Sequence, residues 1–211
     1  LPTARYKLVY AEDVKDDLES VVKEVEAELP YTLFVKPSNM GSSVGISKVR
    51  NTEELRAALA LAGKYDRRII IEEGINCREV ETGVIGNHKP EVAAVGEIVA
   101  KLDFYDYTAK YTDDAGTELS IPAKLPASTY EEIRTLAKKA YMALDCSGFA
   151  RIDFFVDKDT GQVYINEINT IPGFTKYSMF PLMWKEAGVS FRELVERIVD
   201  LGYERYYAKN N

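Results

Sequence analysis

The chain of 211 residues contains only one histidine and two cysteines. Cys77 and Cys146 stand far apart without metal-ligand spacing, which favours reduced, buried thiols over a disulfide or a zinc site. The histidine, His88, lies in a Gly-Asn-His-Lys-Pro turn between two strand-like segments, where we expect it to face solvent. This scarcity argues against zinc chemistry and against histidine-based acid–base or triad catalysis.

Long apolar runs, a secretory signal and an excess of basic residues are also missing. No apolar segment approaches membrane-spanning length, and the first residues lack the charged-then-apolar pattern of a signal peptide, so we expect a cytoplasmic protein with no membrane partner. The formal net charge of −7 argues against nucleic acid as a partner. With 46% hydrophobic residues, the chain can bury a core and fits one large domain or two small ones.

Polar side chains converge on the stretch 151–169. Two runs of β-branched and aromatic residues flank an Asp-Lys-Asp-Thr-Gly turn, which is the pattern of a β-hairpin. Because side chains alternate between faces, Arg151 and Asp153 share one face of the first strand, and Glu167 and Asn169 share one face of the second. Mg²⁺ prefers such oxygen ligands together with substrate phosphates. The hairpin therefore predicts a magnesium site for a nucleotide polyphosphate; the alternative is a solvated sheet face.

A loop rich in glycine and serine, residues 37–45, is a second candidate site. A predicted strand over 32–35 delivers Lys36 into this loop, and another strand is predicted over 46–49. Small residues let backbone N–H groups approach phosphate oxygens, so the loop is a candidate phosphate lid. It is not a Walker loop, because the lysine precedes the glycines and no helix follows directly. The alternative is an ordinary hairpin tip.

The rest of the chain alternates between helical and strand patterns. Glu79 and Glu81 share one face of a predicted hairpin, 78–85 with 91–99, and either could accept ribose hydroxyls, although a solvated face is an equal alternative. A further short strand is predicted over 68–71. Helical periodicity and capping boxes at Asn51, Ser128 and Ser190 predict helices over 12–29, 53–62, 128–144 and from 190 onward.

Residues 101–119 form a long polar connection rich in tyrosine. Such a connection is usually a functional loop or a disordered one, and its aromatic content argues against disorder. We interpret it as an active-site Ω-loop in which Lys110 is a second phosphate cation and Tyr111 hydrogen-bonds near the substrate. The alternative is that the tyrosines only fasten the loop to the core.

Four segments give the chain a resemblance to a known family: VKPSNMGSSVGISKV, FYDYTAKY, GFARIDFF and INEINTIPGFTKYSMFP. In this order and spacing they resemble the ATP-grasp part of the D-alanine–D-alanine ligases. The resemblance implies an α+β ATP-grasp fold with two α+β subdomains, 1–75 and 76–211, and the nucleotide between two mainly antiparallel sheets. It also implies synthesis of a peptidoglycan precursor: ATP phosphorylates one D-alanine, and the amine of a second attacks the acyl phosphate to give D-alanyl-D-alanine, ADP and phosphate.

The resemblance further implies roles for individual residues. ATP would be bound by Lys36, Gly41, Ser42, Ser43, Glu72, Glu73, Ile75, Glu79 and Lys110, with Glu79 on the ribose and 72–75 as the adenine linker. Two Mg²⁺ ions, or Mn²⁺, would be held by Asp153, Glu167 and Asn169. The second D-alanine would contact Gly173, Ser178 and Met179. Catalysis would depend on Arg151, Ser42, Lys110 and Tyr111, with Arg151 neutralising the tetrahedral intermediate.

The chain departs from the family pattern in two places. Family members have a separate N-terminal domain that supplies groups for the first D-alanine and a further phosphate-contacting lysine, so we expect this chain to be a truncated fragment that binds ATP but catalyses poorly. A homodimer is possible for the full-length protein. Glu73-Gly74 also replaces a basic-aromatic pair found in some members.

Two other functions remain as alternatives. A D-alanine–D-lactate depsipeptide ligase is disfavoured by the Lys110-Tyr111 pair. A non-catalytic nucleotide-binding domain is disfavoured because Asp153 and Glu167 are both present.

Overall fold

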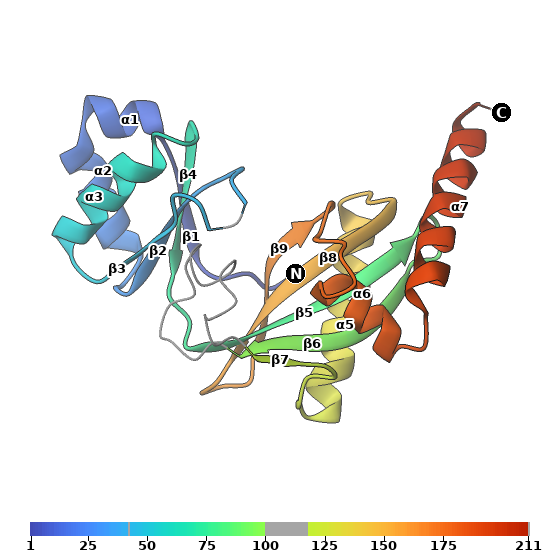
Figure 1. Cartoon of the computed structure of the whole chain (residues 1–211). Coiled ribbons are helices and arrows are strands. Elements are labelled where there is room, and N and C mark those ends of the chain that lie inside the picture. The colour runs from blue at the N-terminus through green and yellow to red at the C-terminus, as the bar shows by residue number, and fades with distance from the viewer. Residues whose placement is uncertain (42, 100–117, 211) are drawn as a thin grey trace. The chain divides into compact units, whose positions relative to one another are not determined.

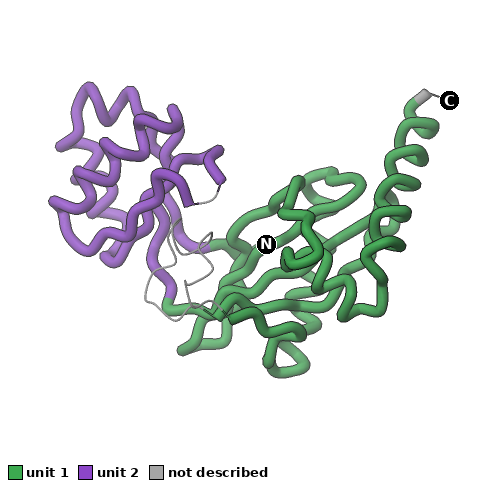
Figure 2. Tube along the Cα trace, viewed as in Figure 1, with its two compact units in different colours: residues 1–3, 76–101, 117–211 green, residues 4–75, 102–116 purple. Residues whose placement is uncertain are grey.

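The computed structural model describes residues 1–41, 43–99 and 118–210 (Figure 1). These residues fold as two compact units (Figure 2). The N-terminal unit is Ala4–Ile75, and the C-terminal unit comprises Leu1–Thr3 and the described residues from Asn76 onward. Each unit has one antiparallel sheet and its own helices, so the predicted α+β class with two antiparallel sheets is confirmed.

The sheet of the N-terminal unit has four strands in the order β1-β4-β2-β3. Their bounds are Tyr6–Tyr10 for β1, Leu33–Pro37 for β2, Ser47–Val49 for β3 and Arg68–Glu73 for β4. Helices α1 (Ala11–Asp16), α2 (Leu18–Glu28) and α3 (Thr52–Ala62) lie on one face (Figure 1). Alternate strand residues such as Leu33, Val35, Ile69 and Ile71 point to these helices and are fully buried. The predicted strands around the Gly/Ser loop are therefore present, and they pair with each other.

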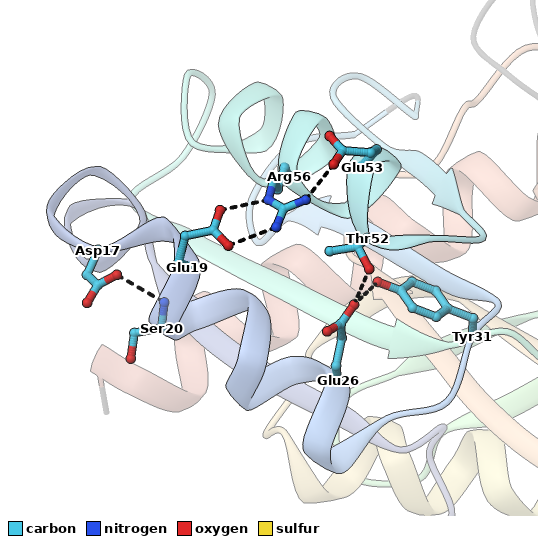
Figure 3. Close-up of polar contacts among 8 residues, drawn as sticks. All are labelled: Asp17, Glu19, Ser20, Glu26, Tyr31, Thr52, Glu53 and Arg56. Atoms are coloured by element: carbon cyan, nitrogen blue, oxygen red, sulfur yellow. Dashed lines mark hydrogen bonds and ion pairs between the residues drawn. The ribbon is translucent and has the colours of Figure 1, made fainter.

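The single helix predicted over 12–29 is wrong, because the chain breaks at Asp17. The backbone of Asp17 is outside the helical region, with φ −150° and ψ 78°. Its carboxylate accepts a hydrogen bond from the N–H of Ser20 at 3.0 Å, which caps α2 (Figure 3). The apolar periodicity continues through the break, so the hydrophobic pattern alone could not locate it.

A polar network ties α2 to α3 on their solvent side (Figure 3). Arg56 donates from Nε and Nη2 to the two carboxylate oxygens of Glu19, at 2.7 and 2.8 Å. Nearby, the hydroxyls of Thr52 and Tyr31 donate to the same oxygen of Glu26 at 2.6 and 2.8 Å. These two hydrogen bonds, Thr52 first, lower the pKa of Glu26. The helices are thus joined by apolar packing underneath and by charge-assisted hydrogen bonds above.

The sheet of the C-terminal unit has five antiparallel strands in the order β7-β6-β5-β8-β9. Their bounds are Cys77–Gly86 for β5, Glu91–Val99 for β6, Glu118–Ser120 for β7, Gly148–Asp157 for β8 and Val163–Asn169 for β9. Helix α5 (Ala127–Ala143) covers one face, and helices α6 (Met179–Glu186) and α7 (Phe191–Asn210) pack against the other. None of the helices in the described residues is long and apolar enough to cross a membrane.

Two of the three predicted helix caps are present in the structure, and the third is not. Asn51 accepts from the N–H of Glu54 at 2.9 Å, and Ser190 accepts from the N–H of Glu193 at 3.2 Å, so these two caps are confirmed. The predicted Ser128 cap is wrong, because α5 begins at Ala127 after Pro126 and no side chain caps it. Helix α6 was not predicted at all, since its aromatic and methionine-rich sequence carries no polar face.

Candidate active site

The predicted hairpin is formed by β8 and β9, and its register aligns the polar residues. Arg151 stands opposite Asn169, and Asp153 stands opposite Glu167. The turn between the strands is closed by Asp157, whose carboxylate accepts from the N–H groups of Asp159 and Thr160 at 2.8 Å each. Directly opposed side chains on neighbouring strands are close enough to interact. The hairpin therefore brings all four residues onto one small area of the sheet.

Arg151 is the centre of a charge cluster on this face. Its Nε and Nη2 donate to the two carboxylate oxygens of Asp153, at 2.7 Å each. Glu81 Oε2 lies 3.2 Å from Arg151 Nε, and Glu167 Oε1 lies 3.9 Å from Nη2. Burial lowers the pKa of the guanidinium, but Asp153, then Glu81 and Glu167, outweigh it and raise the pKa above its ordinary value. The cluster therefore holds a permanent positive charge among three carboxylates.

Glu81 is the residue that sequence reasoning missed. The alternative of a solvated face is wrong for Glu81, because only 2% of its surface is accessible, whereas Glu79 on the same strand is exposed. Glu81 stands opposite Asp153 on the neighbouring strand β8. The period-two pattern placed it on the correct face, but only the pairing of β5 with β8 shows that this face contains Arg151.

The donors near Arg151 are suitable for a hard divalent cation. Asp153 and Glu167 have side chains that are 15% and 58% accessible, so both carboxylates can be reached from solvent. The amide oxygen of Asn169 accepts from the N–H of Ile171 at 3.1 Å, which fixes its orientation. Among the described residues no group of three or more His, Cys, Asp or Glu side chains has a metal-binding arrangement. The predicted set is of a different kind, because it has two carboxylates and one amide. Mg²⁺ commonly takes one or two protein carboxylates, so this set fits it.

In the N-terminal unit, Lys36 pairs with Glu72. Lys36 Nζ lies 2.6 Å from Glu72 Oε2, and both side chains are about four-fifths buried. The pairing of β2 with β4 makes them diagonal neighbours, because Lys36 stands opposite Ile70 and Glu72 opposite Phe34. Glu73 instead accepts from the N–H of Arg5 at 3.0 Å, and Ile75 is half-buried at the end of the unit. Two predicted nucleotide-binding residues, Lys36 and Glu72, are thus in direct contact.

The loop after Lys36 is anchored at its base. Asp66 Oδ2 accepts from the backbone N–H and the side-chain amide of Asn39, at 2.8 and 2.7 Å. Ser43 and Gly45 have positive φ angles of 59° and 75°, and Gly41 is exposed. A Cβ on Gly45 would lie 2.7 Å from the Tyr65 ring, so this position requires glycine both for its backbone angle and for space. The base of the loop is therefore fixed by hydrogen bonds and close packing, while Gly41 is exposed.

Three predicted residues lie outside the described part of the chain: Ser42, Lys110 and Tyr111. The predicted Ω-loop, 101–119, is described only at its end, where β7 begins at Glu118.

Gly173, Ser178 and Met179, the predicted contacts of the second D-alanine, meet at the start of α6. Ser178 precedes the helix, and its hydroxyl accepts from the N–H of Thr175 at 3.1 Å. A Cβ on Gly173 would lie 3.2 Å from that hydroxyl. Met179 is buried, and its methyl group would meet a Cβ on Gly96, which stands opposite Glu81 in the sheet. These residues therefore lie on the same sheet face as the Arg151 cluster.

Known proteins match the whole length of this fold. The family model described as D-ala D-ala ligase C-terminus matches residues 1–200. A D-alanine–D-alanine ligase from Bacillus velezensis is 54% identical over 209 residues, which are 99% of this chain and 58% of that protein. Its counterpart from Acetivibrio thermocellus is 52% identical over 206 residues, 98% of this chain and 54% of that protein.

Two solved structures also superpose closely. A D-Ala:D-Ser ligase from Enterococcus faecalis has a TM-score of 0.84 at 39% identity and covers 95% of this chain and 57% of its own. The D-alanine–D-alanine ligase from Coxiella burnetii has a TM-score of 0.84 at 30% identity, and the match covers 100% of this chain and 54% of that protein. These neighbours confirm the predicted ATP-grasp fold. The chain spans a little over half the length of the relatives it matches. By its sequence and its fold, the chain belongs to the family of D-Ala–D-Ala ligase C-terminal regions.

Proposed function

We propose that the protein containing this chain joins two D-alanine molecules at the expense of ATP, for synthesis of a peptidoglycan precursor. A carboxylate oxygen of the first D-alanine attacks the γ-phosphorus and releases ADP. The amine of the second D-alanine then attacks the acyl phosphate and releases phosphate. The names of the relatives, about 50% identical over nearly all of this chain, support this reaction. The observation that carries the proposal is the Arg151 cluster, with its guanidinium and solvent-accessible carboxylates on one hairpin.

In this proposal Arg151 stabilises the oxyanion of the tetrahedral intermediate. The guanidinium carries five N–H donors, and its two hydrogen bonds to Asp153 use two of them. A donor that is already held in place avoids the cost of reorganising during the reaction, which is why fixed donors contribute strongly to catalysis. Arg151 is therefore assigned as a catalytic residue.

Asp153, Glu167 and Asn169 are the residues that would hold Mg²⁺ or Mn²⁺, as two ions with Glu167 shared between them. The bound cations would neutralise the phosphate oxygens during phosphoryl transfer. The protein's own contribution is to hold oxygen ligands on adjacent strands, with Asn169 oriented by its backbone hydrogen bond. Because Asp153 also pairs with Arg151, the metal ligands and the catalytic cation are fixed by the same two strands.

The N-terminal unit would supply much of the nucleotide site, and residues 1–75 and 76–211 are assigned as its two ATP-grasp subdomains. Lys36 would contact the phosphates, and the loop residues Gly41, Ser42 and Ser43 would cover them. Residues 72–75 would bind the adenine, and Glu79 in the second subdomain would bind the ribose. The contact between Lys36 and Glu72 supports a common site for these two residues.

Three further assignments complete the proposed site. Lys110 and Tyr111 would act on the phosphates and the substrate, as the family resemblance implies. Gly173, Ser178 and Met179 would surround the second D-alanine, and their position beside the sheet face of Arg151 supports this role.

A direct assay tests the proposal. The natural polypeptide containing this chain is incubated with ATP, Mg²⁺ and D-alanine, and ADP and D-alanyl-D-alanine are measured. We expect Glu167→Gln to abolish most of the activity, because it removes one of two metal carboxylates. Titration of the 211-residue chain with ATP and Mg²⁺ by calorimetry should show binding that Glu167→Gln weakens. Product formation by the wild type without a requirement for ATP would overturn the proposal.

The acceptor is tested in the same assay. One solved neighbour is a D-Ala:D-Ser ligase, so D-serine and D-lactate are added in competition with D-alanine. We expect D-alanine to be the preferred acceptor. A preference for D-lactate would assign the chain to the depsipeptide ligases instead.

A further inference from the structure

Glu81 is an acid that the proposed reaction leaves without a role. We propose that Glu81 is a positioning residue for Arg151: it retains the guanidinium in place when cations take over the carboxylates of Asp153 and Glu167. This inference rests on the proposed function, because it assumes that Arg151 stabilises the intermediate and that the other two acids bind metal.

Glu81 is the least accessible of the three acids around Arg151. Glu81 Oε2 lies 3.2 Å from Arg151 Nε, within the sheet formed by β5 and β8. The three acids around Arg151 differ in accessibility: the side chain of Glu81 is 3% accessible, that of Asp153 is 15% and that of Glu167 is 58%. A metal arriving from solvent therefore reaches Asp153 and Glu167 first. Glu81 faces the guanidinium from the protein side.

Glu81 is buried because helix α6 packs on the same sheet face. Helix α6 packs so closely on this sheet face that two glycines are needed near Glu81. A Cβ on Gly83 would lie 2.7 Å from Trp184 Nε1, and one on Gly96 would lie 2.6 Å from the methyl group of Met179. Glu81 thus lies where the apolar cover of α6 ends and the charged area begins. A carboxylate in such a position is costly unless it is paired, and Arg151 is its cation.

The acids around Arg151 outnumber its single positive charge. Three carboxylates and one guanidinium leave a net charge of −2 on this area, which one divalent cation would neutralise. When a cation draws on the oxygens of Asp153, the bidentate hold on Arg151 weakens, and Glu81 is the acid that keeps its contact. Without the Glu81 charge, Arg151 would depend more on Asp153 and compete with the metal for it. Loss of Glu81 should therefore affect both turnover and metal affinity.

The experiment compares two isosteric charge removals, Glu81→Gln and Glu97→Gln, in the natural polypeptide that contains this chain. Glu97 is a matched control: it is also buried in the same sheet and paired with an arginine, since Arg78 Nη2 lies 2.6 Å from its Oε2. It belongs to the opposite face, because Arg78 also donates to the carbonyl of Lys124, next to the core beneath α5.

For Glu81→Gln we expect kcat to fall by about 10–100-fold while the KM for ATP stays within about threefold, as for other residues that orient a metal or catalytic group. The Kd for Mn²⁺, measured from the spin-resonance signal of the free ion, should rise by about tenfold. Glu97→Gln should leave both values unchanged. Equal effects of the two variants, or a normal kcat and Mn²⁺ affinity in Glu81→Gln, would overturn the inference.

A second variant, Glu81→Asp, tests the inference if Glu81→Gln does not fold. Glu81→Asp keeps the charge but withdraws the carboxylate from Arg151, so we expect a smaller loss of kcat at an unchanged melting temperature. A normal kcat in Glu81→Asp together with a misfolded Glu81→Gln would mean that Glu81 is only structural. If the wild type itself forms no product, the proposed function fails. The Mn²⁺ measurement still decides the inference in that case, because an unchanged Kd in a folded variant contradicts it.

Discussion

The two faces of the five-stranded sheet have opposite characters. The face under α5 is mainly apolar, with Ile152, Phe154 and Val156 of β8 buried against the helix, and its charged pair Arg78–Glu97 lies away from Arg151. The other face is apolar only where α6 and α7 pack on it, and beyond them it contains Arg151 and its acids. Strand β8 contributes to both faces with alternate residues. One strand thus supports the core and the candidate site at once, and the two roles are separated by side-chain direction alone.

The difference between the two faces explains how a charged site can be rigid. The α5 face supplies the hydrophobic free energy that fixes β8, because apolar area buried there is removed from water. The charged face shares this fixed backbone, and ion pairs then hold the side chains of Arg151 and its acids. Substitutions on the two faces should therefore separate loss of stability from loss of activity.

The largest expected effect is on the apolar face. Phe154→Ala removes a ring that is only 1% exposed, so it should lower the free energy of unfolding by about 3–5 kcal/mol. Urea unfolding followed by circular dichroism measures it. Phe155→Ala is the matched control, because Phe155 is the neighbouring residue on the other face and is only half-buried. An equal loss in both variants would contradict the separation of the two faces.

The next effect is on the charged face. Arg151→Ala should lower kcat by about 100–1,000-fold, the range found when one preorganised donor to an oxyanion is removed. ATP affinity should change much less, because Arg151 is not assigned to the nucleotide. Steady-state kinetics of the natural polypeptide give kcat, and calorimetric titration with ATP gives the affinity for ATP. Turnover near that of the wild type would remove Arg151 from the reaction.

Much of this arrangement could be predicted from the sequence, because it depends on local alternation. The turn after Asp157 and the period of two placed Arg151 and Asp153 on one face, as the register of β8 with β9 shows. Long-range pairing could not be predicted in this way. Glu81 lies 70 positions before Arg151, and nothing in its own segment indicates that β5 pairs with β8.

Local competition also limited the prediction of helices. The periodicity over 12–29 predicts one helix, whereas the side chain of Asp17 satisfies the N–H of Ser20 and starts a second helix. Helix α6 has a mostly buried, apolar surface, so it shows no contrast between faces from which a helical period could be recognised. The contact of α6 with Gly83 and Gly96 is therefore visible only in the structure.

That contact gives the third prediction, which concerns the boundary between the covered and the charged parts of one face. Gly83→Ala should destabilise the protein by about 1–3 kcal/mol, because its Cβ would lie 2.7 Å from Trp184 Nε1 and 2.9 Å from the Phe180 ring. Gly202→Ala in α7 is the control, since nothing lies within 4 Å of its Cβ and alanine favours a helix. The melting temperatures of both variants are measured by thermal unfolding. A melting temperature of Gly83→Ala at or above that of Gly202→Ala would contradict the close packing of α6.

The smallest effect concerns Cys77, at the end of the charged face. Burial, with the nearby charge of Glu79, raises the pKa of this thiol from 9.0 to about 11. A raised thiol pKa stabilises the fold below pH 9, and this contribution is lost as the pH rises from 9 to 11. At pH 8 the thiolate fraction is thus very small, and alkylation by iodoacetamide in a Cys146→Ser background should be slower than in the urea-unfolded protein, as measured by mass spectrometry. Glu79→Gln should move the midpoint of alkylation to lower pH; an unchanged midpoint would mean that burial alone sets it.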